Sequence, residues 1–177
     1  MTALIGPFQV AALLLAAGGL AKSLRPDDTA RALRAFGVPA RPIVVRAGGA
    51  LELLAGVWAI TTGARAAALV VALSYAAFAA FVRSAERRDV PIASCGCFGK
   101  ADTAPSRVHV VLDLAACAVA AGVAIVGGTG LGDVLAAQPL AGVPYTALVL
   151  IGAWLAFVAL TRLPAVLHAT AASRSRA

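Results

Sequence analysis

The sequence predicts an all-α membrane protein, a polytopic bundle of about five transmembrane helices with a short amphipathic helix on its cytoplasmic side. Three observations lead to this fold class. Of the 177 residues, 61% are hydrophobic and 13% are charged, whereas soluble domains carry about 25% charged residues. Apolar runs of membrane-spanning length recur five times along the chain. Basic residues fall almost entirely on one side of the resulting five-span arrangement.

The five apolar runs are each close to the length of a bilayer-spanning helix, since about 20 residues at about 1.5 Å per residue cross a hydrocarbon core of about 30 Å. They are Ala3–Ala21, Ile43–Thr62, Ala66–Val82, Val108–Gly127 and Val143–Thr161. Positive charges follow the first run instead of preceding it, so we expect a retained anchor and not a cleaved signal. We therefore expect one integral membrane domain over residues 1–165 and a disordered cytoplasmic tail over residues 166–177.

The segments between the runs differ in character. After the first run, Pro26-Asp27-Asp28 is typical of a helix start, and Gly37 and Pro39 end an apolar stripe that is interrupted by arginines. We expect a short amphipathic helix on the membrane surface, and a solvated basic loop is the alternative. Thr62-Gly63-Ala64-Arg65 predicts a tight external hairpin, and the residues from Gly127 to Val143 predict a second external loop.

The basic residues predict the orientation of the chain in the membrane. Fourteen of the 15 Lys and Arg residues lie on one side of the five-span arrangement, and Arg65 alone lies on the other. The positive-inside rule then places the N-terminus outside and the C-terminus in the cytoplasm of a bacterial cell membrane. The same rule accounts for the net charge of +7, so we expect no nucleic-acid partner.

Ser94-Cys95-Gly96-Cys97-Phe98-Gly99 is the most informative stretch of the chain, because it holds two thiols one residue apart. The predicted side is the cytoplasm, where structural disulfides are rare. Basic residues in the same loop favour the thiolate, and a turn at Gly96 would allow a strained, easily reduced disulfide. Thiol–disulfide exchange through Cys95 and Cys97 is the interpretation that we favour. A metal site with His109 as a third ligand and a structural loop are the alternatives, and Cys117 is expected to be a packing residue.

Four ionisable residues are expected in the same membrane leaflet as the cysteines: Lys22, Glu52, His109 and Asp113. Acidic groups inside a span are costly and suggest function. Glu52 and Lys22 are expected to support the thiol site, either because Glu52 moves protons during the redox reaction or because it pairs with Lys22 or Arg46 to fix helix packing. Asp113 is expected to cap the membrane interface, with proton transfer as the alternative, and His109 lies at the mouth of the fourth span.

A series of short matches along residues 1–125 gives the chain a family resemblance. They are Ala21-Lys22 at the end of the first span, Arg25-Pro26, Phe36-Gly37-Val38-Pro39, Glu52 with Gly56, and Cys95-Gly96-Cys97-Phe98-Gly99. On these motifs the chain resembles the MauE-type membrane proteins of methylamine utilisation, within the wider DoxX-like group. The resemblance implies a helper in the maturation of a periplasmic, disulfide-rich enzyme subunit, beside a thioredoxin-like partner. It also makes a quinone a candidate cofactor.

Residues and resemblance together predict a membrane thiol–disulfide redox protein, a candidate thiol–disulfide oxidoreductase. It would pass electrons or disulfides through Cys95 and Cys97 to a thioredoxin-like partner and so support the maturation of an exported protein. The charge rule places the thiols inside, whereas such a client lies outside, so the loop would have to move through the bundle, or electrons would pass to a quinone, or the chain would only scaffold a partner. The alternative is a non-catalytic or quinone-binding subunit of a larger membrane complex.

Overall fold

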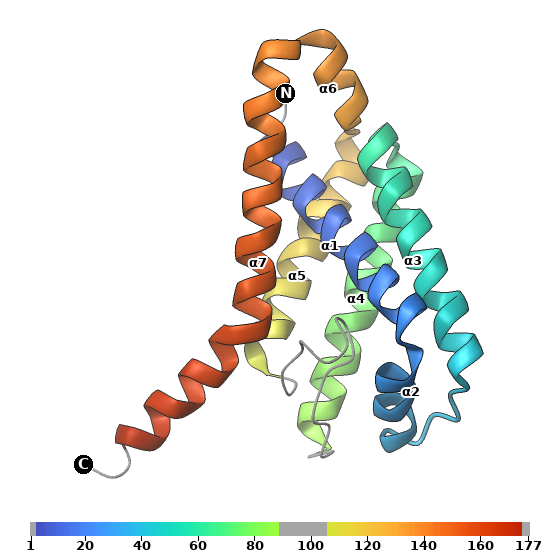
Figure 1. Cartoon of the computed structure of the whole chain (residues 1–177), viewed down its shortest axis with the longest axis vertical. Helices are drawn as coiled ribbons and strands as arrows, with labels where there is room; N and C mark the ends of the chain where they lie inside the picture. The colour runs from blue at the N-terminus through green and yellow to red at the C-terminus, as the bar shows by residue number, and fades with distance from the viewer. Residues whose placement is uncertain (1–2, 89–105, 175–177) are drawn as a thin grey trace.

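The computed structural model describes residues 3–88 and 106–174, and no strand occurs in these residues. Figure 1 shows the helices of this part of the chain as one elongated bundle. They are α1 (Ile5–Leu24), α2 (Pro26–Ala35), α3 (Pro42–Thr62), α4 (Arg65–Arg87), α5 (Arg107–Val126), α6 (Leu131–Ala137) and α7 (Pro139–Arg174). Five are long and apolar enough to cross a membrane: α1, α3, α4, α5 and residues Leu140–Pro164 of α7. The predicted multi-pass helical bundle is confirmed.

The short helix and the hairpin lie where the sequence predicted them. Helix α2 begins with Pro26 in its first turn, carries Asp27 and Asp28 beside it, and has Arg34 in its last turn. Each of these charges complements the dipole at its end of the helix. Helix α3 ends at Gly63, whose φ of 59° is readily adopted by glycine, and α4 begins two residues later at Arg65. The predicted tight connection between the second and third spans is therefore correct.

Two expectations about the C-terminal part were wrong. The predicted loop between Gly127 and Val143 contains the helix α6, and α7 already begins at Pro139. Glycines at both ends of the turn before α6 explain the break in the chain, since Gly127 has a φ of 88°. Helix α7 then continues to Arg174, so most of the expected disordered tail over residues 166–177 is helical. The helix bends in its C-terminal part (Figure 1), where Pro164 lies inside it.

Small residues allow α1 and α3 to pack with their backbones almost in contact. A Cβ atom on Gly19 would lie 2.5 Å from the carbonyl oxygen of Gly49, and a Cβ atom on Gly49 would lie 2.7 Å from that of Gly19. Two turns further along α3, a Cβ atom on Gly56 would come equally close to the backbone of Ala12 and Ala16 on α1. Such contacts replace the hydrophobic effect as the source of helix association in a membrane. Helix α4 packs most extensively against α5, so the bundle consists of two close pairs with α7 beside them.

The core lies between these pairs, and the apolar outer surface suits a lipid environment. Phe8 and Val71 are fully buried, and Leu15 is 2% exposed. Many large apolar side chains point outward instead, among them Leu51, Leu54, Leu148, Ile151 and Trp154. In water such a surface would be unfavourable, whereas in a bilayer it contacts lipid. The exposure therefore agrees with a multi-pass membrane protein.

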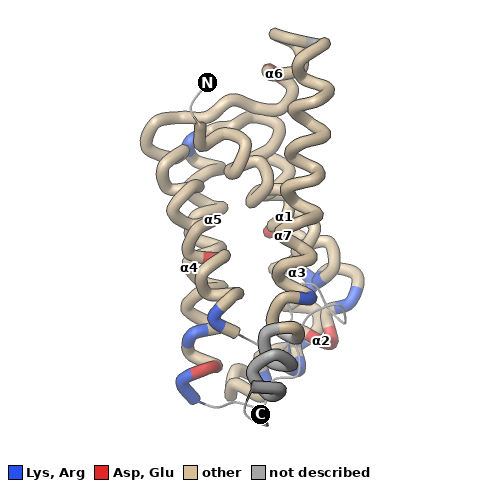
Figure 2. Tube along the Cα trace, turned by 90° about the vertical axis from the view of Figure 1, so that its left-hand side faces the viewer, with Lys and Arg blue, Asp and Glu red and all other residues tan. Residues whose placement is uncertain are grey.

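The basic residues gather at one end of the bundle. Figure 2 shows Lys and Arg concentrated at the end where α2 lies. Arg65 begins α4 at the opposite end, where its Nη2 donates a hydrogen bond of 3.5 Å to the carbonyl oxygen of Val126 at the end of α5. This asymmetry is the one that the sequence predicted. The assignment of the basic end to the cytoplasm stays a prediction from the positive-inside rule.

Adjacent glycines in α3 provide a matched test of the α1–α3 contact. Replacement of Gly49 by Ala would place a Cβ atom 2.7 Å from the Gly19 carbonyl oxygen, so the helices must separate. We expect a loss of about 1–3 kcal/mol in the free energy of unfolding. Gly48→Ala is the control, because nothing lies within 4 Å of its Cβ position. Unfolding in mixed detergent micelles should show Gly49→Ala as clearly less stable than Gly48→Ala, and equal stability would contradict the close contact.

Candidate functional site

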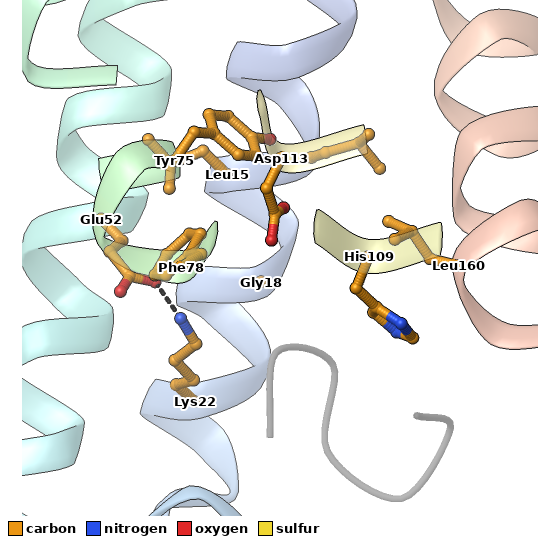
Figure 3. Close-up of a pocket in the computed structure, with 10 residues that line it drawn as sticks. Leu15, Gly18, Lys22, Glu52, Tyr75, Phe78, His109, Asp113 and Leu160 are labelled. Atoms are coloured by element: carbon orange, nitrogen blue, oxygen red, sulfur yellow. Dashed lines mark hydrogen bonds and ion pairs between the residues drawn. The ribbon is translucent and has the colours of Figure 1, made fainter. Parts of the chain in front are cut away.

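An ion pair between α1 and α3 forms the centre of the candidate site. Lys22 Nζ lies 2.6 Å from Glu52 Oε2, and the two side chains are 8% and 20% exposed, respectively. The ammonium also lies 4.4 Å from the centre of the Phe78 ring on α4. Figure 3 shows Lys22, Glu52 and Phe78 converging in this way. A charge-assisted hydrogen bond and a cation–π contact thus stabilise the ammonium away from water.

The glycine contact between α1 and α3 positions this pair. Lys22 follows Gly19 by three residues, and Glu52 follows Gly49 by three residues. Residues three apart lie on the same face of a helix, so both side chains emerge next to the point of closest approach. Lys22 lies in the last turn of α1, where a positive charge is also favoured by the helix dipole.

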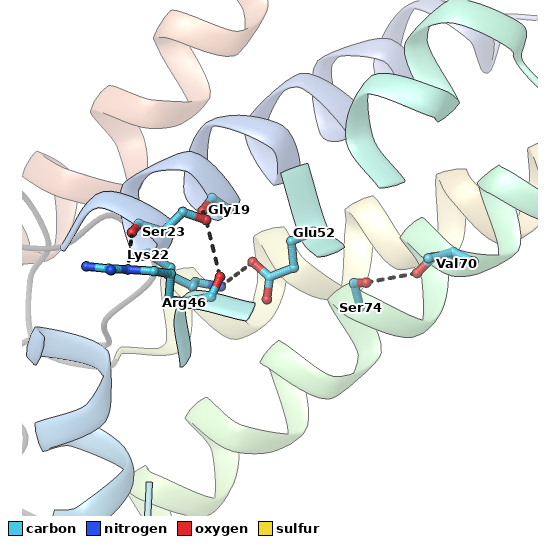
Figure 4. A network of polar contacts seen from close by, with 7 residues as sticks. All are labelled: Gly19, Lys22, Ser23, Arg46, Glu52, Val70 and Ser74. Atoms are coloured by element: carbon cyan, nitrogen blue, oxygen red, sulfur yellow. Dashed lines mark hydrogen bonds and ion pairs between the residues drawn. The ribbon is translucent and has the colours of Figure 1, made fainter. Parts of the chain in front are cut away.

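Arg46 stabilises the same helix pair through the backbone instead of through Glu52. Its Nε donates to the carbonyl oxygen of Ser23 at 3.1 Å, and Ser23 Oγ donates to the carbonyl oxygen of Gly19 at 2.8 Å (Figure 4). The sequence left open whether Lys22 or Arg46 pairs with Glu52. The structure pairs Glu52 with Lys22, because Arg46 lies at the exposed end of the contact.

A small cavity inside the bundle brings Asp113 and His109 toward the ion pair. Its volume is about 30 Å³. Its lining residues include Lys22, Glu52, Tyr75, His109 and Asp113. His109 and Asp113 are 2% and 7% exposed, and they lie on one face of α5, four residues apart. Figure 3 shows Asp113 between Glu52 and His109. A cavity of this size has room for one or two water molecules, although its lining surface is almost entirely apolar.

The structure changes the expected place of Asp113 and gives His109 a partner. Asp113 was expected to cap the membrane interface, but its side chain is buried inside the bundle because its face of α5 packs toward α4 and α1. His109 Nδ1 lies 2.9 Å from the Oγ atom of Ser106, and Ser106 is the residue that precedes α5. The two groups therefore belong to the interior polar cluster and not to the lipid interface.

Two of the three cysteines lie outside the described residues. Cys95 and Cys97 lie in the segment 89–105, outside the part of the chain that the structure describes. Cys117 is a free, half-buried thiol packed against the hydrophobic core, as expected for a packing residue. Within residues 3–88 and 106–174, no group of three His, Cys, Asp or Glu side chains is placed to hold a metal ion.

Sequence reasoning missed the aromatic residues of α4 that line the site. Tyr75 is 7% exposed, and its hydroxyl donates a hydrogen bond of 2.7 Å to the carbonyl oxygen of Ala11 on α1. Its ring contacts that of Phe78 edge to face, with 5.8 Å between the ring centres. The available signal was their spacing, since Tyr75 and Phe78 are three residues apart in an otherwise alanine-rich span and so share one helix face.

The polar cluster combines groups that can hold and transfer protons. Two carboxyl groups, an imidazole and a phenol line one water-sized space inside an apolar bundle. Proton transfer requires such groups within reach of one another or of a bridging water. The cluster could therefore supply or accept protons for a reaction at the basic end of the bundle, where α5 begins.

Removal of Lys22 tests the energetic role of the ion pair. Lys22→Met leaves the Glu52 carboxylate without its partner, and we expect a loss of about 2–3 kcal/mol in the free energy of unfolding. This value is below that of a fully buried pair because the Glu52 side chain keeps 20% exposure. The double variant Lys22→Met/Glu52→Leu removes both charges and should recover most of the loss. Unfolding in mixed detergent micelles measures the free energy of unfolding of the single and the double variant. An equal loss of stability in the two variants would contradict the pairing.

Comparisons with known proteins bear on this site. The searches of curated proteins and of solved structures found no significant match. The family model described as methylamine utilisation protein MauE matches residues 1–129. The match includes helices α1 to α5, the ion pair, the polar cluster and both cysteines of the segment 89–105. It spans well over half of the chain, so this multi-pass membrane protein belongs to the MauE family of methylamine utilisation proteins.

Proposed function

We propose that this chain is a membrane thiol–disulfide redox protein of methylamine utilisation in which Cys95 and Cys97 are the reacting pair. The observation that carries the proposal is the placement of two thiols one residue apart in a segment with glycines at positions 96 and 99. Basic residues in the same segment favour the nucleophilic thiolate. Membership of the MauE family agrees with this proposal, because it assigns the chain to membrane proteins of methylamine utilisation.

The chain on the C-terminal side of the cysteine segment begins beside the polar cluster. Cys95 is seven residues from Arg88, and Cys97 is nine residues from Ser106. Even a fully extended chain keeps Cys95 within about 25 Å of Arg88 and Cys97 within about 32 Å of Ser106. Ser106 contacts His109, which lines the small cavity. The position of Ser106 beside His109 thus supports a functional link between the thiols and the polar cluster.

The proposed reaction is reversible exchange with a thioredoxin-like protein. A thiolate of the partner attacks the Cys95–Cys97 disulfide, which forms a mixed disulfide and releases one thiol of the pair. The second partner thiolate then resolves the mixed disulfide. Two electrons and two protons pass from the partner to Cys95 and Cys97, and the partner becomes a disulfide. In this direction the chain delivers a disulfide to the partner and so supports the maturation of an exported protein, and the reverse reaction passes two electrons and two protons from Cys95 and Cys97 to the partner.

In this proposal Lys22, Glu52, His109 and Asp113 are positioning and proton-handling residues. Each exchange changes the number of protons on the thiols, and the polar cluster offers carboxyl and imidazole groups for them. We further propose a bacterial plasma membrane location, with the N-terminus outside and the basic end in the cytoplasm. A non-catalytic or quinone-binding subunit of a larger membrane complex is the alternative that the next experiment separates from redox exchange.

Single cysteine replacements should trap the partner. With Cys95→Ser or Cys97→Ser, the remaining thiol can form a mixed disulfide, but it lacks the second thiol of the pair. We expect a disulfide-linked complex that disappears on reduction and that contains a thioredoxin-like protein by mass spectrometry. Cys95→Ser/Cys97→Ser should give no complex and should abolish the formation of client disulfides in cells.

Cys117→Ser is the matched control, because Cys117 packs against the core and is not part of the proposed pair. It should leave both the complex and the client disulfides unchanged. Normal client disulfides in cells that carry Cys95→Ser/Cys97→Ser would overturn the redox function and leave the non-catalytic alternative.

Labelling in intact cells tests the proposed orientation. A membrane-impermeant maleimide should label Cys95 and Cys97 only after the cells are opened, because the basic end is predicted to face the cytoplasm. Gly132→Cys in a background without the native cysteines serves as the control from α6, at the opposite end of the bundle. It should be labelled from outside, and its Cβ position has nothing within 4 Å. The reverse pattern would invert the orientation.

A further inference from the structure

A second and larger cavity lies on the other side of the Lys22–Glu52 pair. It has a volume of about 400 Å³ and is bounded by α1, α2, α3, α4 and the residues 38–40. Lys22, Glu52 and Phe78 line both this cavity and the small cavity described above. The ion pair and one aromatic ring are therefore shared between a water-sized space and a larger, mostly apolar pocket of the size that small-molecule sites have, about 300–1,000 Å³.

The pocket has an exposed side and a buried side. Val38 and Val44 are 45% and 63% exposed, whereas Val82 is 1% exposed and Lys22 is 7% exposed. Val44 shares its face of α3 with Leu51, which follows it by seven residues and is 68% exposed. In a bilayer such an apolar face contacts lipid. The pocket therefore opens toward the lipid side of α3 and ends at the ion pair.

At the inner end of the pocket Lys22 carries hydrogen-bond donors, while the Lys22–Glu52 pair as a whole has no net charge. An ammonium carries three N–H donors, and one of those of Lys22 is directed to Glu52. No second acceptor for Lys22 occurs among the described residues. The positive charge of Lys22 is balanced by Glu52 at 2.6 Å. The aromatic ring of Phe81 lines the wall beside that of Phe78, and the remaining wall is almost entirely apolar.

We propose that this pocket binds a neutral, membrane-soluble molecule whose carbonyl head group accepts a hydrogen bond from Lys22. The apolar part of the molecule would fill the pocket toward Val44 and extend into the lipid. A neutral head group is favoured because Glu52 already balances the ammonium and would repel an anion. A quinone ring and the ester group of an acylglycerol share this chemistry, so both are tested. The site is independent of Cys95 and Cys97 and goes beyond the proposed thiol exchange.

Gly48 allows the pocket to be filled without disturbing the helix contact. It lines the pocket, and nothing lies within 4 Å of its Cβ position. In Gly48→Leu the new side chain would occupy ligand space, and leucine favours the helix more than glycine does. Gly6→Leu is the matched control, because Gly6 lies in α1 outside the pocket and also has nothing within 4 Å of its Cβ position.

The test measures binding of decylubiquinone and of dioctanoylglycerol to the purified full chain in lipid nanodiscs. We expect saturable binding of at least one probe, which Gly48→Leu weakens about tenfold or more, while Gly6→Leu leaves it unchanged. Binding of the quinone alone or of the glyceride alone identifies the source of the carbonyl group. Cys95→Ser/Cys97→Ser should bind like the parent chain, so a failure of the redox proposal leaves this result intact.

Three outcomes would overturn the site. The first is that neither probe binds the parent chain in a saturable way. The second is that Gly48→Leu and Gly6→Leu bind equally well, which would place the ligand elsewhere. The third is that decanoate, an anion with a similar apolar chain, competes more strongly than its neutral methyl ester, which would contradict the preference for an uncharged head group.

Discussion

The close contact of two glycines, Gly19 on α1 and Gly49 on α3, is the constraint on which the site depends. Without side chains at these positions the helix backbones approach so closely that a Cβ atom on either one would collide with the other's carbonyl oxygen. In a membrane, where lipid is as apolar as the protein surface, such close packing is a main source of helix association. It also sets the geometry of the next turn, so that Lys22 and Glu52 meet at 2.6 Å.

The resulting ion pair has two different surroundings. On one side lies a water-sized cavity with Asp113, His109 and Tyr75, and on the other lies an apolar pocket of about 400 Å³ that opens toward lipid. A charged pair removed from water is costly unless each charge is balanced and hydrogen-bonded. Here each charge is balanced by its hydrogen-bonded partner, and the Phe78 ring adds a cation–π contact to Lys22. This arrangement places proton-carrying groups and a lipid-accessible space next to each other at the basic end of the bundle.

Much of the fold could be predicted because membrane-spanning segments have a strong local signal. Length, hydropathy and the distribution of basic residues placed the five spans, and proline with acidic residues placed α2. Helix α6 and the long continuation of α7 were missed. Helix α6 has only seven residues and begins directly after Gly130, and α7 contains two prolines and a polar end that favour a break.

For the site, the sequence by itself determined which residues carry charge, which helices hold them and which end of the bundle they share. These follow from the cost of ionisable groups in lipid, which makes Lys22, Glu52 and Asp113 conspicuous. Only the tertiary structure decided that Lys22 and not Arg46 pairs with Glu52, that Asp113 points into the bundle, and that Tyr75 and Phe78 complete the walls. Those choices depend on the rotation and spacing of helices far apart in sequence, which close packing of small residues fixes and which no local pattern encodes.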